Sequence, residues 1–170
     1  MRKFFIVTLA VFSLFFMVVS CQHKSKPVID KSIENIKPEG TEFRQDGALN
    51  FLDSNKKLIS SIAIEIAETD LARAQGLMYR EKMDADKGML FIMEREEPQN
   101  FWMKNTILPL DIIYVSEAMK IVNISPDAVP YSEAQIPSEA PAKYVVEVNA
   151  GYAKQHNLKK GDIISFERNR

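Results

Sequence analysis

The sequence contains few of the residues that cross-link chains, bind metals or attack substrates. Its 170 residues include one cysteine, Cys21, and two histidines, His23 and His156. One cysteine excludes an internal disulfide, so the folded part must be held together by its core. A lone histidine in that part argues against a zinc site of ordinary composition, and the missing thiol excludes cysteine catalysis. We therefore expect no cofactor and no metal.

An excess of positive charge is also missing. The chain has 22 Lys and Arg against 23 Asp and Glu, and without Arg2 and Lys3 the balance is 20 − 23 = −3. Such a balance argues against nucleic acid as a partner and against a basic membrane-binding patch. The sequence also contains no G-x-S-x-G nucleophile motif and no phosphate-binding G-x-x-x-x-G-K.

One long uncharged run is present, at the amino terminus. Residues 4–19 carry no charge and follow Arg2 and Lys3. Sixteen residues are few for a membrane span, which needs about 20, but suit a secretory signal. Ser20 before Cys21 resembles the lipobox of bacterial lipoproteins, which predicts a signal peptide over 1–20 and a lipid on Cys21. A plain signal peptide and an uncleaved anchor helix are the alternatives.

Lipidation at Cys21 would make the membrane a partner and place the protein in the bacterial cell envelope. Residues 21–40 are polar, contain Pro27 and Pro38 and show no sustained period, which is typical of a flexible tether. Residues 41–170 have the length of one domain, which would face the periplasm or the exterior.

Periodicity within 41–170 predicts a mainly β (α+β) domain. Isoleucines alternate over 62–66, and Thr69 or Asp70 begins a helix that Gly76 ends. Further strands are predicted at 89–93, 100–103, 110–115, 120–124, 144–148 and 162–166, with a second helix at 151–157. Because strands mostly follow one another directly, we expect an antiparallel curved sheet or small open barrel with two short helices. Four prolines predict a long loop over 125–142.

The stretch NFWMKNTILPLDIIYV, residues 100–115, contains the main site candidates. In an extended chain Phe101 and Met103 share one face, while Trp102 and Lys104 share the other. An indole beside an ammonium and an amide suits a small polar ligand. The alternative is a sheet covered on both faces, in which Trp102 is part of the core.

Asp111 interrupts a strand that is apolar on both faces. A buried carboxylate is costly unless it is paired or hydrogen-bonded. Lys104, Arg80 or the polar groups of Asn105 and Thr106 could satisfy it. Asp111 is then either a structural residue of the turn before it or a carboxylate that meets a ligand in a cleft.

Two further chemistries have weak support. Six methionines in the folded part could bind cuprous copper, but methionine also fills irregular cores. Asp111 and Glu147 could form the acid pair of a glycoside hydrolase only if the fold brought them together.

The blocks RAQGLMYREKM, GMLFIM, FWMKNTILPLDIIYV and AKYVVEVNAGYAKQHNLKKGD resemble the domain-of-unknown-function family 192, also called uncharacterised protein family 0127. The resemblance covers about residues 62–166. It implies a compact, mainly β domain, often exported or lipid-anchored, with no established activity. The characteristic positions are Gly76, Leu77, Met78, Arg80, Gly88, Met89, Phe101, Trp102, Met103, Lys104, Asn105, Thr106, Pro109, Asp111, Asn149, Gly151 and Gly161.

The sequence therefore favours a binding module for a small polar ligand, possibly saccharide-like. Its predicted site is Trp102 and Lys104 as the floor, Arg80, Asn105 and Asp111 at the edge, and residues 125–142 as the roof. The alternative is a structural or interaction domain that docks an envelope protein through the same face. An enzyme ranks third.

Overall fold

A computed structural model of the chain describes residues 42–169. The signal peptide, Cys21 and the tether predicted for 1–40 lie outside the described residues. No helix within 42–169 is long and apolar enough to cross a membrane.

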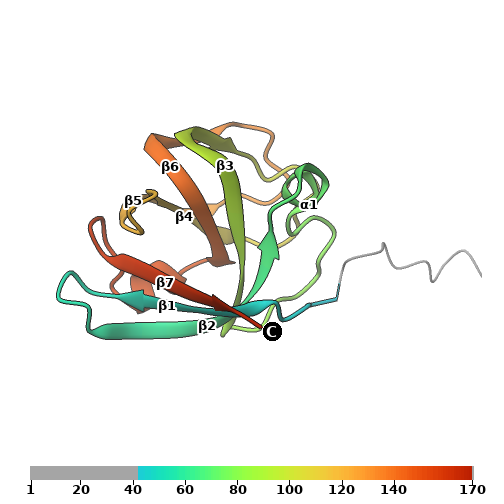
Figure 1. The fold of residues 1–170 in the computed structure, drawn as a ribbon. Coiled ribbons are helices and arrows are strands. Elements are labelled where there is room, and N and C mark those ends of the chain that lie inside the picture. The colour runs from blue at the N-terminus through green and yellow to red at the C-terminus, as the bar shows by residue number, and fades with distance from the viewer. Residues whose placement is uncertain (1–41, 170) are drawn as a thin grey trace, which may run out of the picture. The chain divides into compact units, whose positions relative to one another are not determined.

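A single seven-stranded sheet forms the domain, with strand order β5-β4-β6-β3-β2-β1-β7 (Figure 1). The elements are β1 (Gly47–Leu52), β2 (Leu58–Ala67), α1 (Asp70–Gln75), β3 (Lys87–Phe101), β4 (Leu110–Val115), β5 (Ile121–Ala128), β6 (Ile136–Asn149), α2 (Tyr152–Gln155) and β7 (Ile163–Arg168). All neighbours are antiparallel except β2 and β3, which are parallel and joined through α1. The predicted mainly β class with two short helices is confirmed.

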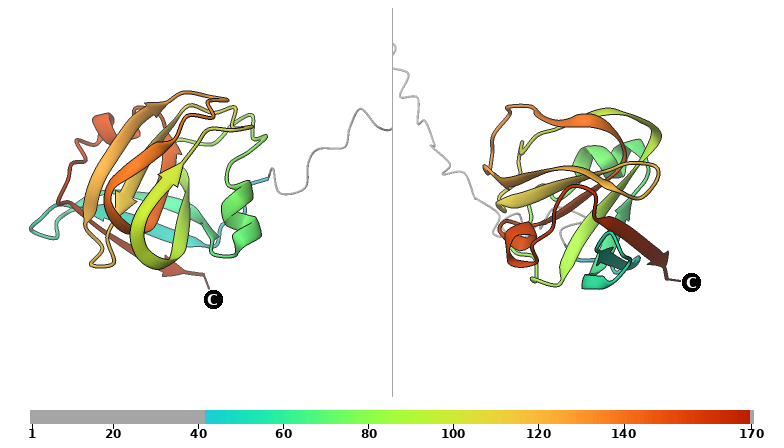
Figure 2. Two further views of the ribbon diagram at one scale, coloured as in Figure 1. Left: turned by 90° about the horizontal axis from the view of Figure 1, so that it is seen from above. Right: turned by 90° about the vertical axis from the view of Figure 1, so that its left-hand side faces the viewer.

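The sheet curls until its two ends meet in part (Figure 2). Lys120, just before β5, bridges Ile163 at the start of β7, and Ile164 N–H donates to the carbonyl of Met119. The result is an open, half-closed barrel, as the sequence predicts.

Alternation along the strands produces two separate cores, one on each face of the sheet. On β6, Val146 and Val148 join the inner cluster that α2 closes through Tyr152, while Val145 joins the outer cluster. The outer cluster includes Leu77, directly after α1. Both faces of the sheet are therefore covered, and successive side chains of one strand belong to different cores.

The helix α1 begins and ends where the sequence predicts. The Thr69 hydroxyl accepts a hydrogen bond from the Ala72 N–H at 3.2 Å, and Gly76 ends the helix at φ 48°. A positive φ is strained for residues with a side chain, so glycine suits this position. The turn directs the segment after α1 back over the outer core.

The long loop predicted over 125–142 is wrong. Strand β5 continues to Ala128, and β6 begins at Ile136. Pro126 is tolerated because β5 is an edge strand. Pro137 and Pro141 are tolerated because this part of β6 pairs with β3 alone, and β4 pairs with β6 only from Tyr144 onward. Proline has no backbone N–H to donate. These segments are paired on one side only, so they do not need that hydrogen bond.

Two other predictions of strand extent are also wrong. The strands expected at 89–93 and 100–103 are one element, β3, which continues through the charged segment EREEPQ. Beyond Phe91 this strand pairs with β6 but no longer with β2, and its ladder is irregular between Ile92 and Glu97. In this part of β3, where β6 is its one neighbour in the sheet, charged side chains can therefore face solvent. Strand β1 was not predicted.

Candidate functional site

Trp102 and Lys104 lie together directly after β3. The indole is 46% exposed, and the Lys104 Nζ lies 5.0 Å from the ring centroid. Lys104 also faces Glu133, with 3.8 Å between Nζ and Oε1. The intervening Met103 is fully buried, whereas Phe101 packs partly buried on the outer core. An exposed ring with a cation beside it is the arrangement that the alternation predicts.

Asn105 lies beside this pair in a tight turn. Its φ is 54°, its carbonyl accepts from the Tyr79 N–H, and its Nδ2 lies 3.9 Å from the Met78 sulfur. Asn105 therefore contacts the segment after α1 and joins it to the turn that bears Trp102.

Arg80 lies inside the protein. It is 4% exposed and donates two hydrogen bonds to the Glu65 carboxylate, one of them at 2.8 Å. Glu65 is equally buried, on β2. A buried ion pair of this kind holds the segment after α1 against the sheet, and its charge is balanced internally.

Asp111 is also internal and lies on the inner face of the sheet. Its carboxylate is 0% exposed and accepts from three backbone N–H groups: Asp127 at 3.0 Å, Gly151 at 3.1 Å and Ala153 at 2.8 Å. It ties the end of β5 and the start of α2 to β4. This is a structural role, and the carboxylate does not reach the face on which Trp102 lies.

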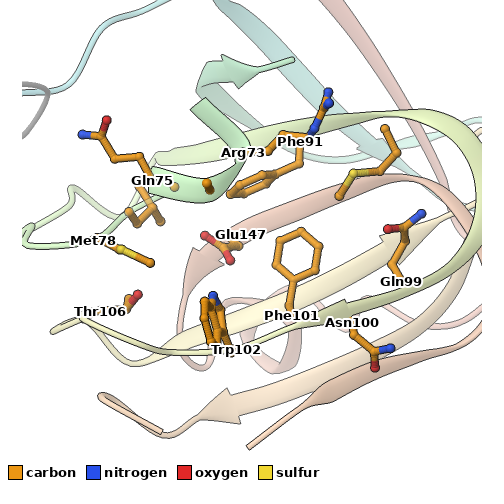
Figure 3. Close-up of a pocket in the computed structure, with 14 residues that line it drawn as sticks. Arg73, Gln75, Met78, Phe91, Gln99, Asn100, Phe101, Trp102, Thr106 and Glu147 are labelled. Carbon is orange, nitrogen blue, oxygen red and sulfur yellow. The ribbon is translucent and has the colours of Figure 1, made fainter. Parts of the chain in front are cut away.

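A cleft of about 270 Å³ opens beside Trp102 on the outer face (Figure 3). Helix α1 and the residues that follow it form one wall, and β3 with the turn after it forms the other. The lining residues are Arg73, Ala74, Gln75, Gly76, Leu77, Met78, Phe91, Met93, Gln99, Asn100, Phe101, Trp102, Thr106 and Glu147. Residues 125–142, predicted to be the roof, are not among them.

The packing of Phe91 defines the inner part of the cleft. A Cβ placed on Gly76 would lie 3.3 Å from the Phe91 Cζ, so this ring needs the glycine beside it. Phe91 and Phe101 form an edge-to-face pair with 5.1 Å between centroids, a favourable aromatic geometry. The walls near Glu147 are therefore mainly aromatic.

Glu147, on β6, is the ionisable group at the base of the cleft. Its side chain lies among Met78, Phe91, Phe101 and Trp102 (Figure 3). It is 5% exposed, and no hydrogen bond or ion pair between described residues reaches its carboxylate. Burial raises the pKa of the Glu147 carboxyl to about 8, so the group is mostly protonated at neutral pH.

The register separates Glu147 from Asp111. Glu147 is opposite Ile112 on β4, whereas Asp111 is opposite Val148. Directly opposite residues share a face and neighbours along a strand do not, so the two acids point to opposite faces. This excludes them as the acid pair of a glycoside hydrolase.

From the sequence, Glu147 is only a possible acid partner of Asp111, although the reasoning applied to Asp111 also applies to Glu147. The segment YVVEVN carries one charge in a run that is apolar on both faces. Phe91 and Gly76 gave no such signal, because an aromatic residue in a strand and a glycine after a helix both have ordinary structural explanations.

The methionines and histidine are placed as follows. Met89 and Met103 are buried in the outer core, and His156 packs on the Tyr152 ring at 4.3 Å between centroids. Among residues 42–169, no cluster of three His, Cys, Asp or Glu side chains could hold a metal ion.

Comparison with known proteins identifies the family. Residues 51–166 match the model of domain-of-unknown-function family 192, described as an uncharacterized ACR. The chain belongs to this family. The family match begins at Phe51, near the end of β1, whereas the resemblance noted from the sequence begins at about residue 62.

Solved structures of relatives agree with this fold. A protein from Sinorhizobium meliloti 1021, described as a proposed transcription regulator, is 36% identical, with a TM-score of 0.69 over 74% of this chain and 97% of the other. A protein of unknown function from Novosphingobium aromaticivorans DSM 12444 is 33% identical, with a TM-score of 0.66 over 69% of this chain and 83% of the other. No curated protein matches the chain.

Proposed function

We propose that this domain is a binding module for a small ligand, which enters the cleft between α1 and the turn that bears Trp102. The observation that carries the proposal is Glu147: a buried acid at the base of an aromatic cleft, without a hydrogen-bond or ion-pair partner among residues 42–169. A buried polar group without a partner costs free energy, and ligands commonly satisfy such groups in apolar pockets. Trp102, half exposed at the same cleft, supplies an amphipathic contact surface.

Of the predicted site residues, one would contact the ligand and the others would support the site. Trp102 would contact the ligand, and Lys104 and Asn105 would hold the turn around the indole. Arg80 and Asp111 would act on the site only through the fold, because Arg80 is paired with Glu65 and Asp111 accepts backbone hydrogen bonds inside the domain.

Trp102 is the only tryptophan, so its fluorescence tests the proposal. We expect the free protein to be quenched by acrylamide, and a binding compound from a library of sugars, amines, amino acids and short peptides to shift the emission and reduce quenching. Ala74→Leu adds volume to an exposed residue that lines the cleft and should abolish the response. Ala118→Leu, in an exposed turn outside the lining, is the matched control.

A protein partner is the second candidate, favoured by exposed apolar side chains around the same turn. Tyr79 donates its N–H to Asn105, Tyr131 donates its N–H to Thr106, and both rings are exposed near Trp102. Aromatic groups of this kind are common anchors at interfaces. Partner binding should be lost in the double variant Tyr79→Ser and Tyr131→Ser but survive Ala74→Leu.

We also propose that the module is a lipid-anchored envelope protein. The support is the sequence of residues 4–21, with its uncharged run and Cys21. Metabolic labelling with radioactive palmitate should label the wild type and not Cys21→Ala. A label that persists in the variant would refute the anchor and leave the ligand-binding proposal untouched.

A further inference from the structure

We infer that the cleft is built for a small organic cation bearing a methylated ammonium group, with Glu147 as its counterion. The inference rests on the proposed ligand-binding function and specifies the ligand class. Glu147 comes from β6, an interior strand of the sheet, and reaches the cleft at 5% exposure. A cation entering the cleft would find this carboxylate at its base.

The side chains around Glu147 favour a positive charge. Phe91, Phe101 and Trp102 line the same cleft, and Met78 adds a polarisable thioether. Aromatic rings attract cations through the negative charge of their faces, and methylated ammonium groups are recognised in this way by aromatic cages. A neutral sugar would gain from the indole but would bring no positive charge to the carboxylate.

The charges near Glu147 are already balanced. Arg73 lines the cleft, but its guanidinium turns away from Glu147 and donates to the carbonyls of Glu68 and Ile92 and to the Asp70 carboxylate (Figure 3). Arg80 is neutralised by Glu65. On β4, the Tyr114 hydroxyl donates to the carbonyl of Ile136, and burial with the nearby Glu147 raises its pKa. Glu147 is therefore the ionisable group that faces the cleft without a counterion among the described residues.

The rings of the lining favour methylated over primary ammonium, because Phe91, Phe101 and Trp102 offer methyl groups a contact surface but offer N–H groups no carbonyl or carboxylate acceptor. A primary ammonium has three N–H donors to satisfy, whereas a trimethylammonium has none. The volume of about 270 Å³ suits a ligand smaller than most drug-like compounds, whose sites span roughly 300–1,000 Å³.

Binding should be linked to proton release. Burial holds the pKa of Glu147 at about 8, so the free site is protonated at pH 7, while a cation binds to the ionised form. Affinity should therefore rise about tenfold per pH unit from pH 6 and level off above pH 8. At pH 7 nearly one proton should leave per ligand bound.

Choline and 3,3-dimethylbutan-1-ol provide the test, because they have the same shape and differ in the charge of the central atom. Isothermal titration of the domain should detect choline and not the neutral alcohol. Glu147→Gln should weaken choline binding about 30-fold or more. Glu167→Gln, the same change at an exposed residue of β7, should bind like the wild type.

Each outcome decides between the two proposals. Equal binding of choline and the alcohol, or choline binding unaffected by Glu147→Gln, overturns the cation inference. Binding of a neutral sugar or an anion that Ala74→Leu blocks, without choline binding, overturns it also but leaves the ligand-binding function standing. A Trp102 emission that no compound of the library or choline moves overturns both.

Discussion

Asp111 and Glu147 are two buried acids on adjacent strands, but they differ in the hydrogen bonds that their carboxyl groups accept. Asp111, on the inner face, accepts three backbone hydrogen bonds and ties β4 to β5 and α2. Glu147, on the outer face, has no such partner in the part of the chain that the structure describes, and it lies in the cleft lined by α1. Burial alone therefore does not reveal the role of an acid. The number of donors around it decides whether it is satisfied within the fold.

The largest effect on stability should follow from removing Asp111, whose carboxylate accepts three hydrogen bonds. Asp111→Ala removes a fully buried carboxylate that accepts from three backbone N–H groups and should lower the free energy of unfolding by about 5 kcal/mol. Urea denaturation measures the loss. Asp86→Ala removes an exposed acid and should change stability by less than about 0.5 kcal/mol. A loss below about 1 kcal/mol for Asp111→Ala would show that the two acids do not differ as proposed.

Removing the carboxyl group of Glu147 should have the opposite effect on the free energy of unfolding. The carboxyl of Glu147 has a pKa of about 8 when folded and about 4.5 when unfolded. Between these values the unfolded chain releases a proton that the folded chain keeps, so the wild type loses stability as pH rises from 4.5 to 8.

Glu147→Gln removes this titration. We expect the variant to be more stable than the wild type by about 3–4 kcal/mol at pH 8 and nearly equal to it at pH 4.5. Urea denaturation across this pH range gives the difference, with Glu167→Gln as the control. Parallel stability curves for the wild type and Glu147→Gln would contradict a raised pKa.

A smaller effect should come from Gly76, where α1 turns into the cleft wall. Gly76→Ala places a Cβ 3.3 Å from the Phe91 ring at a φ of 48° and should cost about 1–2 kcal/mol. Gly161 also has a positive φ, 92°, but open space around its Cβ position. Gly161→Ala therefore measures backbone strain alone, and a larger cost at Gly76 would report contact with Phe91. Equal costs would show that the ring moves freely.

The smallest effect should be at the surface of the cleft. Lys104→Ala removes an exposed ammonium from the Trp102 ring and should change stability by under about 1 kcal/mol. It should nevertheless shift the emission of Trp102, which Lys160→Ala, at another exposed lysine, should not. An unchanged emission spectrum would mean that the two groups do not stay in contact in solution.

Sequence patterns located most of the strands because alternation reflects burial. They failed at 94–99 and 136–142, where charge and proline normally indicate loops. These segments form strands because each is paired on one side only, so charges reach solvent and proline loses no bond. The neighbouring strand, and not the local sequence, decides this.

The candidate site shows the same division. The alternation after Asn100 predicted an exposed indole beside a lysine, and the structure has both. It could not predict that Arg80 is neutralised by Glu65, which precedes it by fifteen residues. Nor could it predict that Glu147 faces Phe91 and Trp102 across the cleft.

The sequence by itself determined the family and the mainly β class, and it singled out Trp102 and Asp111 as candidate site residues. Composition and local period carry that information because they record how much of each segment is buried. Only the tertiary structure decided which buried charge has a partner. Hydrogen bonds and ion pairs join residues distant in the chain, and strand register determines whether an acid faces three backbone donors or an aromatic cleft.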